Sequence, residues 1–186
     1  STVSLGETVE EVDRVLATFN AILSLSRVHA GAEGKLVDLD VSELCDEMAE
    51  LFEPACEDAG IAFTFDIASG LELSGDRALL AQAVANLLDN AVKYTPSGET
   101  IGFSAILKDQ EIEVTVEDSG PGIPEQDLER VKDRFVRLDD ARTQPGSGLG
   151  LALVDAVAEL HKGRFDISRS QSKSGLKATL ILPAKR

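Results

Sequence analysis

The feature that most constrains the fold is a pair of strand patterns that follow each other without a helix between them. Residues 101–107 and 111–117 both alternate apolar and polar side chains, and a turn at 108–110 joins them. Strands joined so closely pair as an antiparallel hairpin, whereas parallel strands need a long crossover. A second pair of strand patterns, at 164–169 and 177–182, ends the chain. A doubly wound parallel sheet is therefore disfavoured.

Helical patterns separate the remaining strands. Ser42 and Asp76 stand where two of these helices are predicted to begin, and both residue types favour helix N-caps. The other predicted elements are an edge strand at 35–41, a strand at 61–67, and helices at 43–59, 77–94 and 148–161. We therefore expect an α/β two-layer sandwich, in which a mixed sheet packs on about three helices.

An apolar seam at heptad spacing runs along the first part of the chain. It consists of Leu5, Val9, Val12, Leu16, Phe19 and Leu23. About three heptads are few for an independent coiled coil. Two interpretations stay open, a helix packed on the rest of the domain or half of a helical hairpin that associates into a bundle. Residues 31–40 are then expected to be a linker and an edge strand, and residues 41–186 a second unit.

Charge and cysteine content limit the classes of partner. The chain has 33 acidic and 18 basic residues, a net charge of −15, which disfavours a general nucleic-acid binder. A polyphosphate would have to be bound locally, by backbone N–H groups, a metal ion and a few cations. Cys45 and Cys56 are about 16 Å apart along one predicted helix, too far for a disulfide. Free thiols and the lack of a long apolar run predict a cytoplasmic domain.

Four polar residues share one face of the helix predicted at 77–94. Asn86 and Asn90 are four residues apart, and Lys93 and Tyr94 follow one turn later. An Asn side-chain oxygen suits Mg²⁺, a Lys can meet phosphate as a point charge, and a Tyr ring offers an apolar wall. Taken alone, the same pattern is equally compatible with a solvated helix face.

Two glycine-rich turns follow. Asp118 ends a strand pattern and precedes Gly120 and Gly122, so its carboxylate could accept a hydrogen bond from an exocyclic amine. An ordinary Asp-Ser-Gly turn would look the same. Residues 146–150 read Gly-Ser-Gly-Leu-Gly before a helix, where free N–H groups favour phosphate. No strand directly precedes these glycines, which disfavours a dinucleotide-binding fold.

The order and spacing of the three motifs are more specific than any one of them. Asn90, Asp118 with its glycines, and the 146–150 turn resemble the N, G1 and G2 boxes of the sensor histidine kinase ATPase domain. This Bergerat-type fold is shared with gyrase B, Hsp90 and MutL, and the resemblance covers about 41–183. The string from Asn86 to Pro96 is close to the histidine kinase form, because the other branches usually carry an acidic residue where Lys93 stands.

The resemblance implies roles for residues on both sides of a nucleotide. On the phosphate side, Asn90 would coordinate Mg²⁺ near Asn86, while Lys93 and Arg137 would contact phosphate. The lid would end in Gly146, Ser147, Gly148, Leu149 and Gly150. The adenine side would be formed by Tyr94, Asp118, Gly120, Gly122, Ile123 and Thr179.

The resemblance also implies a reaction and partners. The γ-phosphoryl group of Mg-ATP would be transferred to a histidine nitrogen, with Asn86, Lys93 and Arg137 in catalytic roles. Residues 1–30 resemble the second helix of a dimerisation and phosphotransfer hairpin, whose first helix carries the phosphoacceptor histidine and is absent here. We therefore expect no autophosphorylation in cis. The implied partners are that hairpin, a second protomer and a response regulator, and the parent protein could be anchored in the inner membrane.

Some residues depart from the family pattern. The F box keeps Phe135, but Lys132 replaces its second aromatic residue, which puts lid packing in doubt. His29 and His161 lack the context of a phosphoacceptor and are predicted to be surface or capping residues. Two rival functions stay open, a nucleotide-sensing scaffold without transfer and an ATPase of the gyrase or Hsp90 branch.

Overall fold

The computed structural model describes most of the chain after residue 35. The described residues are 36–122, 124–128, 150–171 and 174–186 and, nearer the N-terminus, Val9, Val12, Leu16, Phe19, Asn20, Ile22, Leu23 and 26–28.

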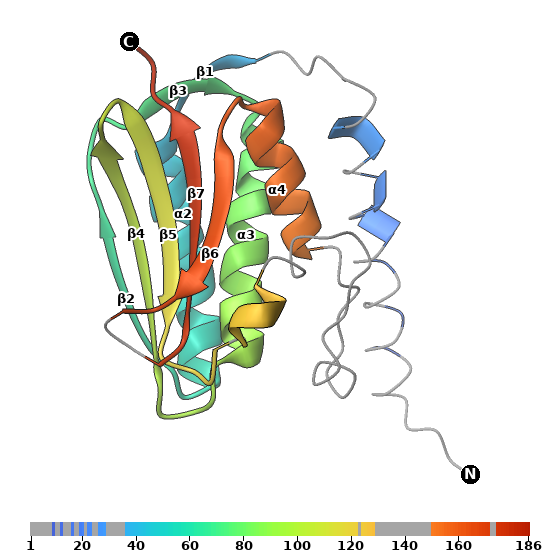
Figure 1. Ribbon diagram of the computed structural model, residues 1–186, viewed down its shortest axis with the longest axis vertical. Coiled ribbons are helices and arrows are strands. Elements are labelled where there is room, and N and C mark those ends of the chain that lie inside the picture. The colour runs from blue at the N-terminus through green and yellow to red at the C-terminus, as the bar shows by residue number, and fades with distance from the viewer. Residues whose placement is uncertain are drawn as a thin grey trace.

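A five-stranded mixed sheet forms one layer of the molecule, as Figure 1 shows. Its strand order is β2-β4-β5-β7-β6. Only the β2–β4 pair is parallel, and the other pairs are antiparallel. The strands are β2 (Ala62–Ile67), β4 (Thr100–Lys108), β5 (Glu111–Asp118), β6 (Arg164–Arg169) and β7 (Leu176–Pro183). The predicted hairpins are therefore confirmed, and the sheet is mixed as expected.

Three helices form the second layer and cover one face of the sheet (Figure 1). They are α2 (Val41–Asp58), α3 (Arg77–Tyr94) and α4 (Gly150–Leu160), and a short 3-10 helix, η1 (Glu125–Asp127), follows β5. The alternation of buried residues along β4 and β5 places every second side chain under the helices. The predicted two-layer α/β sandwich is confirmed.

Polar side chains fix the start of α2 and α3. Asp76 caps α3 as predicted, because its carboxylate accepts from the N–H of Leu79 at 3.0 Å. For α2 the prediction was wrong, because Asp40 is the cap and accepts from the N–H of Glu43 at 3.1 Å. Ser42 lies inside the helix, where its hydroxyl donates to the carbonyl of Ala68 at 2.7 Å.

A small second sheet was not predicted. Strand β1 (Val37–Asp40) pairs antiparallel with β3 (Glu72–Gly75) and lies at one end of the sandwich. β3 is only four residues long, so its alternation is too short to stand out in the sequence. Its last residue, Gly75, directly precedes the cap of α3, so this sheet fixes where α3 begins.

The N-terminal seam is helical and exposed at the positions that are described. Val9, Val12, Leu16, Phe19 and Leu23 are each between 47% and 58% exposed. The helices among the described residues include none that is both long enough and apolar enough to cross a lipid bilayer.

Candidate functional site

The two predicted Asn residues lie one turn apart on α3, and Asn86 contacts the start of α4. Both are half-buried, and the amide nitrogen of Asn86 donates to the carbonyl of Gly150 at 3.3 Å. Gly150 is the first residue of α4, so this bond ties the middle of α3 to the start of α4. The N-terminal end of a helix carries free N–H groups and a partial positive charge. Asn86 thus holds the N-terminal end of α4 against α3.

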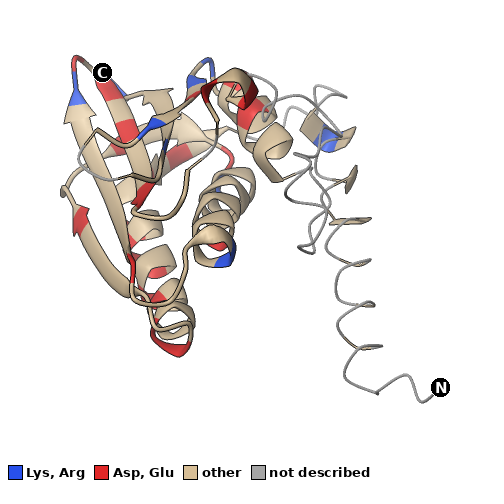
Figure 2. Ribbon diagram, turned by 60° about the horizontal axis from the view of Figure 1, so that its bottom comes forward, with Lys and Arg blue, Asp and Glu red and all other residues tan. Residues whose placement is uncertain are grey.

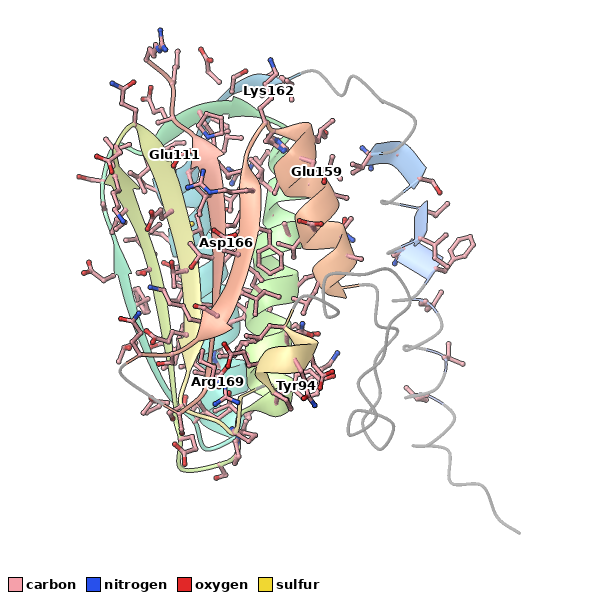
Figure 3. All side chains as sticks on the ribbon, viewed as in Figure 1. Tyr94, Glu111, Glu159, Lys162, Asp166 and Arg169 are labelled. Atoms are coloured by element: carbon pink, nitrogen blue, oxygen red, sulfur yellow. The ribbon has the colours of Figure 1, made fainter. Side chains whose placement is uncertain are left out.

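Lys93 and Tyr94 close α3 at the end of this face. The Lys93 ammonium pairs with Asp89 at 2.8 Å, and both side chains are about half exposed, at 44% and 52%. An exposed pair one turn apart contributes only about 0.3–0.5 kcal/mol, so Lys93 can leave it for another anion. Tyr94 is 41% exposed and lies toward the lower end of the sandwich (Figure 3). Its ring is therefore accessible to a ligand.

Asp118 is buried at the end of β5, with 8% of its surface exposed. Its Oδ1 accepts from the N–H of Gly120 at 2.9 Å and from the N–H of Leu176 at 3.4 Å. The carboxylate therefore organises the turn that follows it and joins that turn to the start of β7. A buried carboxylate bonded in this way is held in a fixed orientation.

Close backbone packing around Asp118 explains why glycines surround it. A Cβ on Gly175 would lie 2.0 Å from the Asp118 carbonyl oxygen and 2.3 Å from Oδ1. A Cβ on Gly120 would lie 3.0 Å from Oδ1. Gly122 has a φ of +72°, which L side chains rarely adopt. These glycines let three stretches of backbone meet at one carboxylate.

Serine hydroxyls brace the same turn. The Ser119 hydroxyl accepts from the N–H of Thr100 at 2.9 Å and bonds the carboxylate of Glu99 at 2.5 Å. The Ser174 hydroxyl donates to the carbonyls of Ser119 and Gly120 at 3.2 and 3.3 Å. The turn is thus fixed to the start of β4 and to the segment before β7.

The structure brings the described parts of the three motifs together around α3. The carbonyl of Tyr94 is 3.2 Å from the position of a Cβ on Gly120, so the end of α3 contacts the Asp118 turn. Gly150 contacts Asn86 on the same helix. The Asp118 turn and Gly150, which are 32 residues apart in the sequence, therefore both flank α3. The predicted residues Ile123, Arg137, Gly146, Ser147, Gly148 and Leu149, and the F box, lie outside the described residues.

Thr179 does not join this group. It lies in the middle of β7, opposite Thr115 of β5, and the two hydroxyl oxygens are 3.2 Å apart. Asp118 and Thr115 are three residues apart on β5, and successive side chains of a strand point to opposite faces. Thr179 and Thr115 are therefore on the sheet face opposite Asp118, and the predicted contact of Thr179 with the same ligand is not supported by this geometry.

The sequence interpretation missed the residues at the start of β7 and directly before it. Ser174, Gly175 and Leu176 all contact the Asp118 turn, yet none was predicted as a site residue. The sequence feature that could have indicated them is a Ser-Gly pair directly before the last strand pattern. Such a pair predicts a tight turn, but it does not show which other part of the chain contacts that turn.

A metal in this region would depend on few protein ligands. Within the described ranges, no group of three or more His, Cys, Asp or Glu side chains could hold a metal ion. Mg²⁺ is typically held by one or two side-chain oxygens, with water and substrate phosphates completing its shell. The amide oxygen of Asn90 fits that requirement. Figure 2 shows acidic residues spread over the described ribbon, so any phosphate must be bound by local donors rather than by a basic surface.

Comparisons with known proteins agree with this arrangement. Residues 75–186 match the model of the histidine kinase-, DNA gyrase B-, and HSP90-like ATPase family. The sensor-like histidine kinase SenX3 of Mycolicibacterium smegmatis is 38% identical over 180 residues, which are 94% of this chain and 46% of that protein. The chain thus spans less than half the length of this curated relative.

Solved structures give the same result. The mycobacterial sensor histidine kinase MprB is 32% identical with a TM-score of 0.70, and the match covers 81% of this chain and 98% of that one. Full-length ShkA, solved in complex with AMPPNP, is 25% identical with a TM-score of 0.81, over 99% of this chain and 40% of that one. The chain belongs to the histidine kinase-, DNA gyrase B- and HSP90-like ATPase family, and it contains the ATP-binding domain of a sensor histidine kinase.

Proposed function

We propose that this chain binds Mg-ATP between α3, the Asp118 turn and the start of α4, and transfers the γ-phosphoryl group to a histidine outside the chain. The observation that carries the proposal is the meeting of three motifs on one helix. The Tyr94 end of α3 contacts the Asp118 turn, and Asn86 contacts Gly150. Phosphoryl transfer requires mainly positioning and charge neutralisation, which such a rigid arrangement supplies.

Each described residue then has a role that its surroundings permit. Asp118 would accept a hydrogen bond from the adenine amino group, and Tyr94 would lie against the base. Asn90 would hold Mg²⁺, which neutralises phosphate charge when bound, and Lys93 would leave Asp89 to contact phosphate. Arg137 and the glycines at 146–150 complete the proposed phosphate side.

The test is transfer in trans. The chain is mixed with a separate hairpin fragment that carries a phosphoacceptor histidine, and label from γ-labelled ATP is followed into each chain. We expect the hairpin to be labelled by the wild-type chain and not by Asn90→Ala. Tight binding without transfer would favour a scaffold, and steady hydrolysis without a hairpin would favour the gyrase or Hsp90 branch.

Lys93 offers a separate prediction with a built-in control. Lys93→Ala should weaken Mg-ATP binding about tenfold, because a charge-assisted bond to phosphate contributes about 1.5 kcal/mol or more. Asp89→Ala removes the same ion pair but leaves the ammonium, so it should retain or slightly improve binding. Both variants should unfold within about 0.5 kcal/mol of the wild type. Equal losses of affinity, measured by calorimetry, would show that the ion pair itself supports the site.

The exposed seam near the N-terminus supports a proposal about assembly. Apolar side chains at heptad spacing that are about half exposed, such as Val12, Leu16 and Phe19, suit a helical bundle with another hairpin helix. We therefore propose that the parent protein is a homodimer that phosphorylates a response regulator through this hairpin. His161 is not a candidate acceptor in this chain, because it is buried and both ring nitrogens have hydrogen-bond partners.

A further inference from the structure

His161 directly follows α4 and is only 6% exposed. Its Nε2 lies 3.0 Å from the backbone nitrogen of Asp76, and its Nδ1 lies 2.7 Å from the carbonyl oxygen of Val157. The N–H of Asp76 can only donate, so Nε2 must accept. Nδ1 must then carry the proton and donate to Val157. The two bonds define one neutral tautomer of the ring.

The bond to Asp76 reaches the first residue of another helix. Asp76 is the N-cap of α3, and its carboxylate accepts from Leu79 while its N–H donates to His161. The imidazole also lies on Gly75, since a Cβ there would be 2.9 Å from Nε2. His161 therefore joins the end of α4 to the cap of α3, with a ring that fills the space that Gly75 leaves.

A second bond joins the same two helices at the other end of α4. Asn86 of α3 donates to Gly150, the first residue of α4. Asp76 and Asn86 are ten residues apart on α3, and His161 and Gly150 are eleven apart on the other side, so the helices run antiparallel with one bond at each end of α4. Lys162, next to His161, and Tyr94 lie at opposite ends of the molecule in Figure 3. The His161 bond therefore fixes the alignment of α4 against α3 from the end remote from the nucleotide.

We propose that His161 is a positioning residue for nucleotide binding, which holds α4 in the alignment that places its N-terminus beside Asn86 and the phosphates. This inference rests on the proposed nucleotide site. It adds that the site depends on a hydrogen bond more than two helical turns away. A small slide of α4 along α3 would move the free N–H groups at Gly150 away from the phosphates, and hydrogen bonds are sensitive to such displacement.

Protonation should release this bond. A protonated ring would donate at both nitrogens, and Nε2 would then face the N–H of Asp76, another donor. Burial lowers the pKa of His161 below its usual range, although the bond to Val157 and the charge of Asp76 act in the opposite direction. The bond is therefore intact above about pH 6.5 and is lost as the pH falls through the lowered pKa, and stability decreases in the same range.

The test compares Mg-ADP affinity and thermal unfolding in this 186-residue chain. His161→Leu removes the acceptor and should weaken Mg-ADP binding about three- to tenfold at pH 7.5. His161→Gln keeps an acceptor near the position of Nε2 and should restore most of that affinity. Ser42→Ala is the matched control, because the Ser42 hydroxyl also joins distant parts of the chain, through its bonds to Ala68 and Leu71, and neither bond involves α3 or α4. It should lower Tm without changing affinity.

A pH series separates positioning from simple stabilisation. The ratio of wild-type to His161→Gln affinity should fall as the pH is lowered from 7.5 through the pKa of the His161 ring, which NMR titration of the wild type locates, while titration of the nucleotide itself affects both proteins equally. If His161→Leu does not fold, this ratio still decides the question. A lower Tm with unchanged affinity, or a constant ratio, would overturn the positioning role. Absence of Mg-ADP binding by the wild type would instead overturn the proposed function.

Discussion

Replacing Gly175 with alanine is expected to abolish measurable Mg-ADP binding and to lower the free energy of unfolding by about 2–3 kcal/mol. The added Cβ would lie 2.0 Å from the Asp118 carbonyl oxygen and 2.3 Å from Oδ1, far inside van der Waals contact. The nearest atoms belong to backbone and to a buried carboxylate, so no flexible side-chain end can move aside. β7 or the Asp118 turn must shift, and either shift breaks the bond from Leu176 to Asp118.

Gly102→Ala provides the matched control for this prediction. Gly102 lies within β4 of the same sheet, and a Cβ there would meet nothing closer than 3.8 Å. Chemical denaturation and calorimetric titration of both variants therefore separate steric overlap from the general effect of adding a methyl group. Normal binding by Gly175→Ala would mean that the turn around Asp118 can rearrange without loss, and that its fixed geometry is not required.

The elements of this fold were predictable where one local pattern determined them. The hairpin of β4 and β5 follows from two alternating runs and a short turn, in which Asp109 and Gln110 both have positive φ. Asp76 was recognised as a cap, and its carboxylate does accept from the N–H of Leu79. At α2, Asp40 and Ser42 are both residue types that favour N-caps. Cap propensity alone cannot tell which of the two side chains will instead bond a residue distant in the sequence. The bonds of Ser42 to Ala68 and Leu71 decide this, and they depend on the tertiary fold.

The site residues also divide into those that a local pattern predicts and those that depend on long-range contacts. Asn86, Asn90, Lys93 and Tyr94 share a face because a helix has a fixed period, so the sequence alone predicts their proximity. Thr179 was placed by resemblance of its surrounding string, but strand alternation and the register with Thr115 put it on the other sheet face. The register depends on how two strands pair, so it cannot be predicted from the sequence of one strand alone.

Gly175 and His161 were missed as site determinants for a related reason. Their importance lies in what approaches them, a carbonyl oxygen of Asp118 in one case and the cap of α3 in the other. Each of these contacts joins residues more than 50 positions apart in the sequence. The residues next to a glycine or a histidine in the sequence do not indicate which distant backbone atoms will contact it. These contacts can be identified only from the folded structure.

Asp118→Asn is expected to weaken Mg-ADP binding about 10- to 100-fold while leaving the fold largely intact. The Asn oxygen can still accept from the N–H of Gly120, so the turn keeps the bond of 2.9 Å that now orders it. The second position of the side chain then becomes an NH₂ group, which donates and cannot accept. A donor there would oppose the amino group of adenine in the proposed pose.

The same reversal predicts a change in base preference. Inosine diphosphate carries a carbonyl oxygen where adenine has its amino group, so Asp118→Asn should lose less affinity for Mg-IDP than for Mg-ADP. Asp166→Asn is the control, because Asp166 is exposed on β6 and its nearest ion pair, with Arg164, is long at 3.8 Å. Equal losses for both nucleotides would show that Asp118 only orders the turn, and unchanged affinity for both would remove it from the site. A selective loss for ADP requires that this carboxylate face the base, because a purely structural defect would not distinguish an amine from a carbonyl.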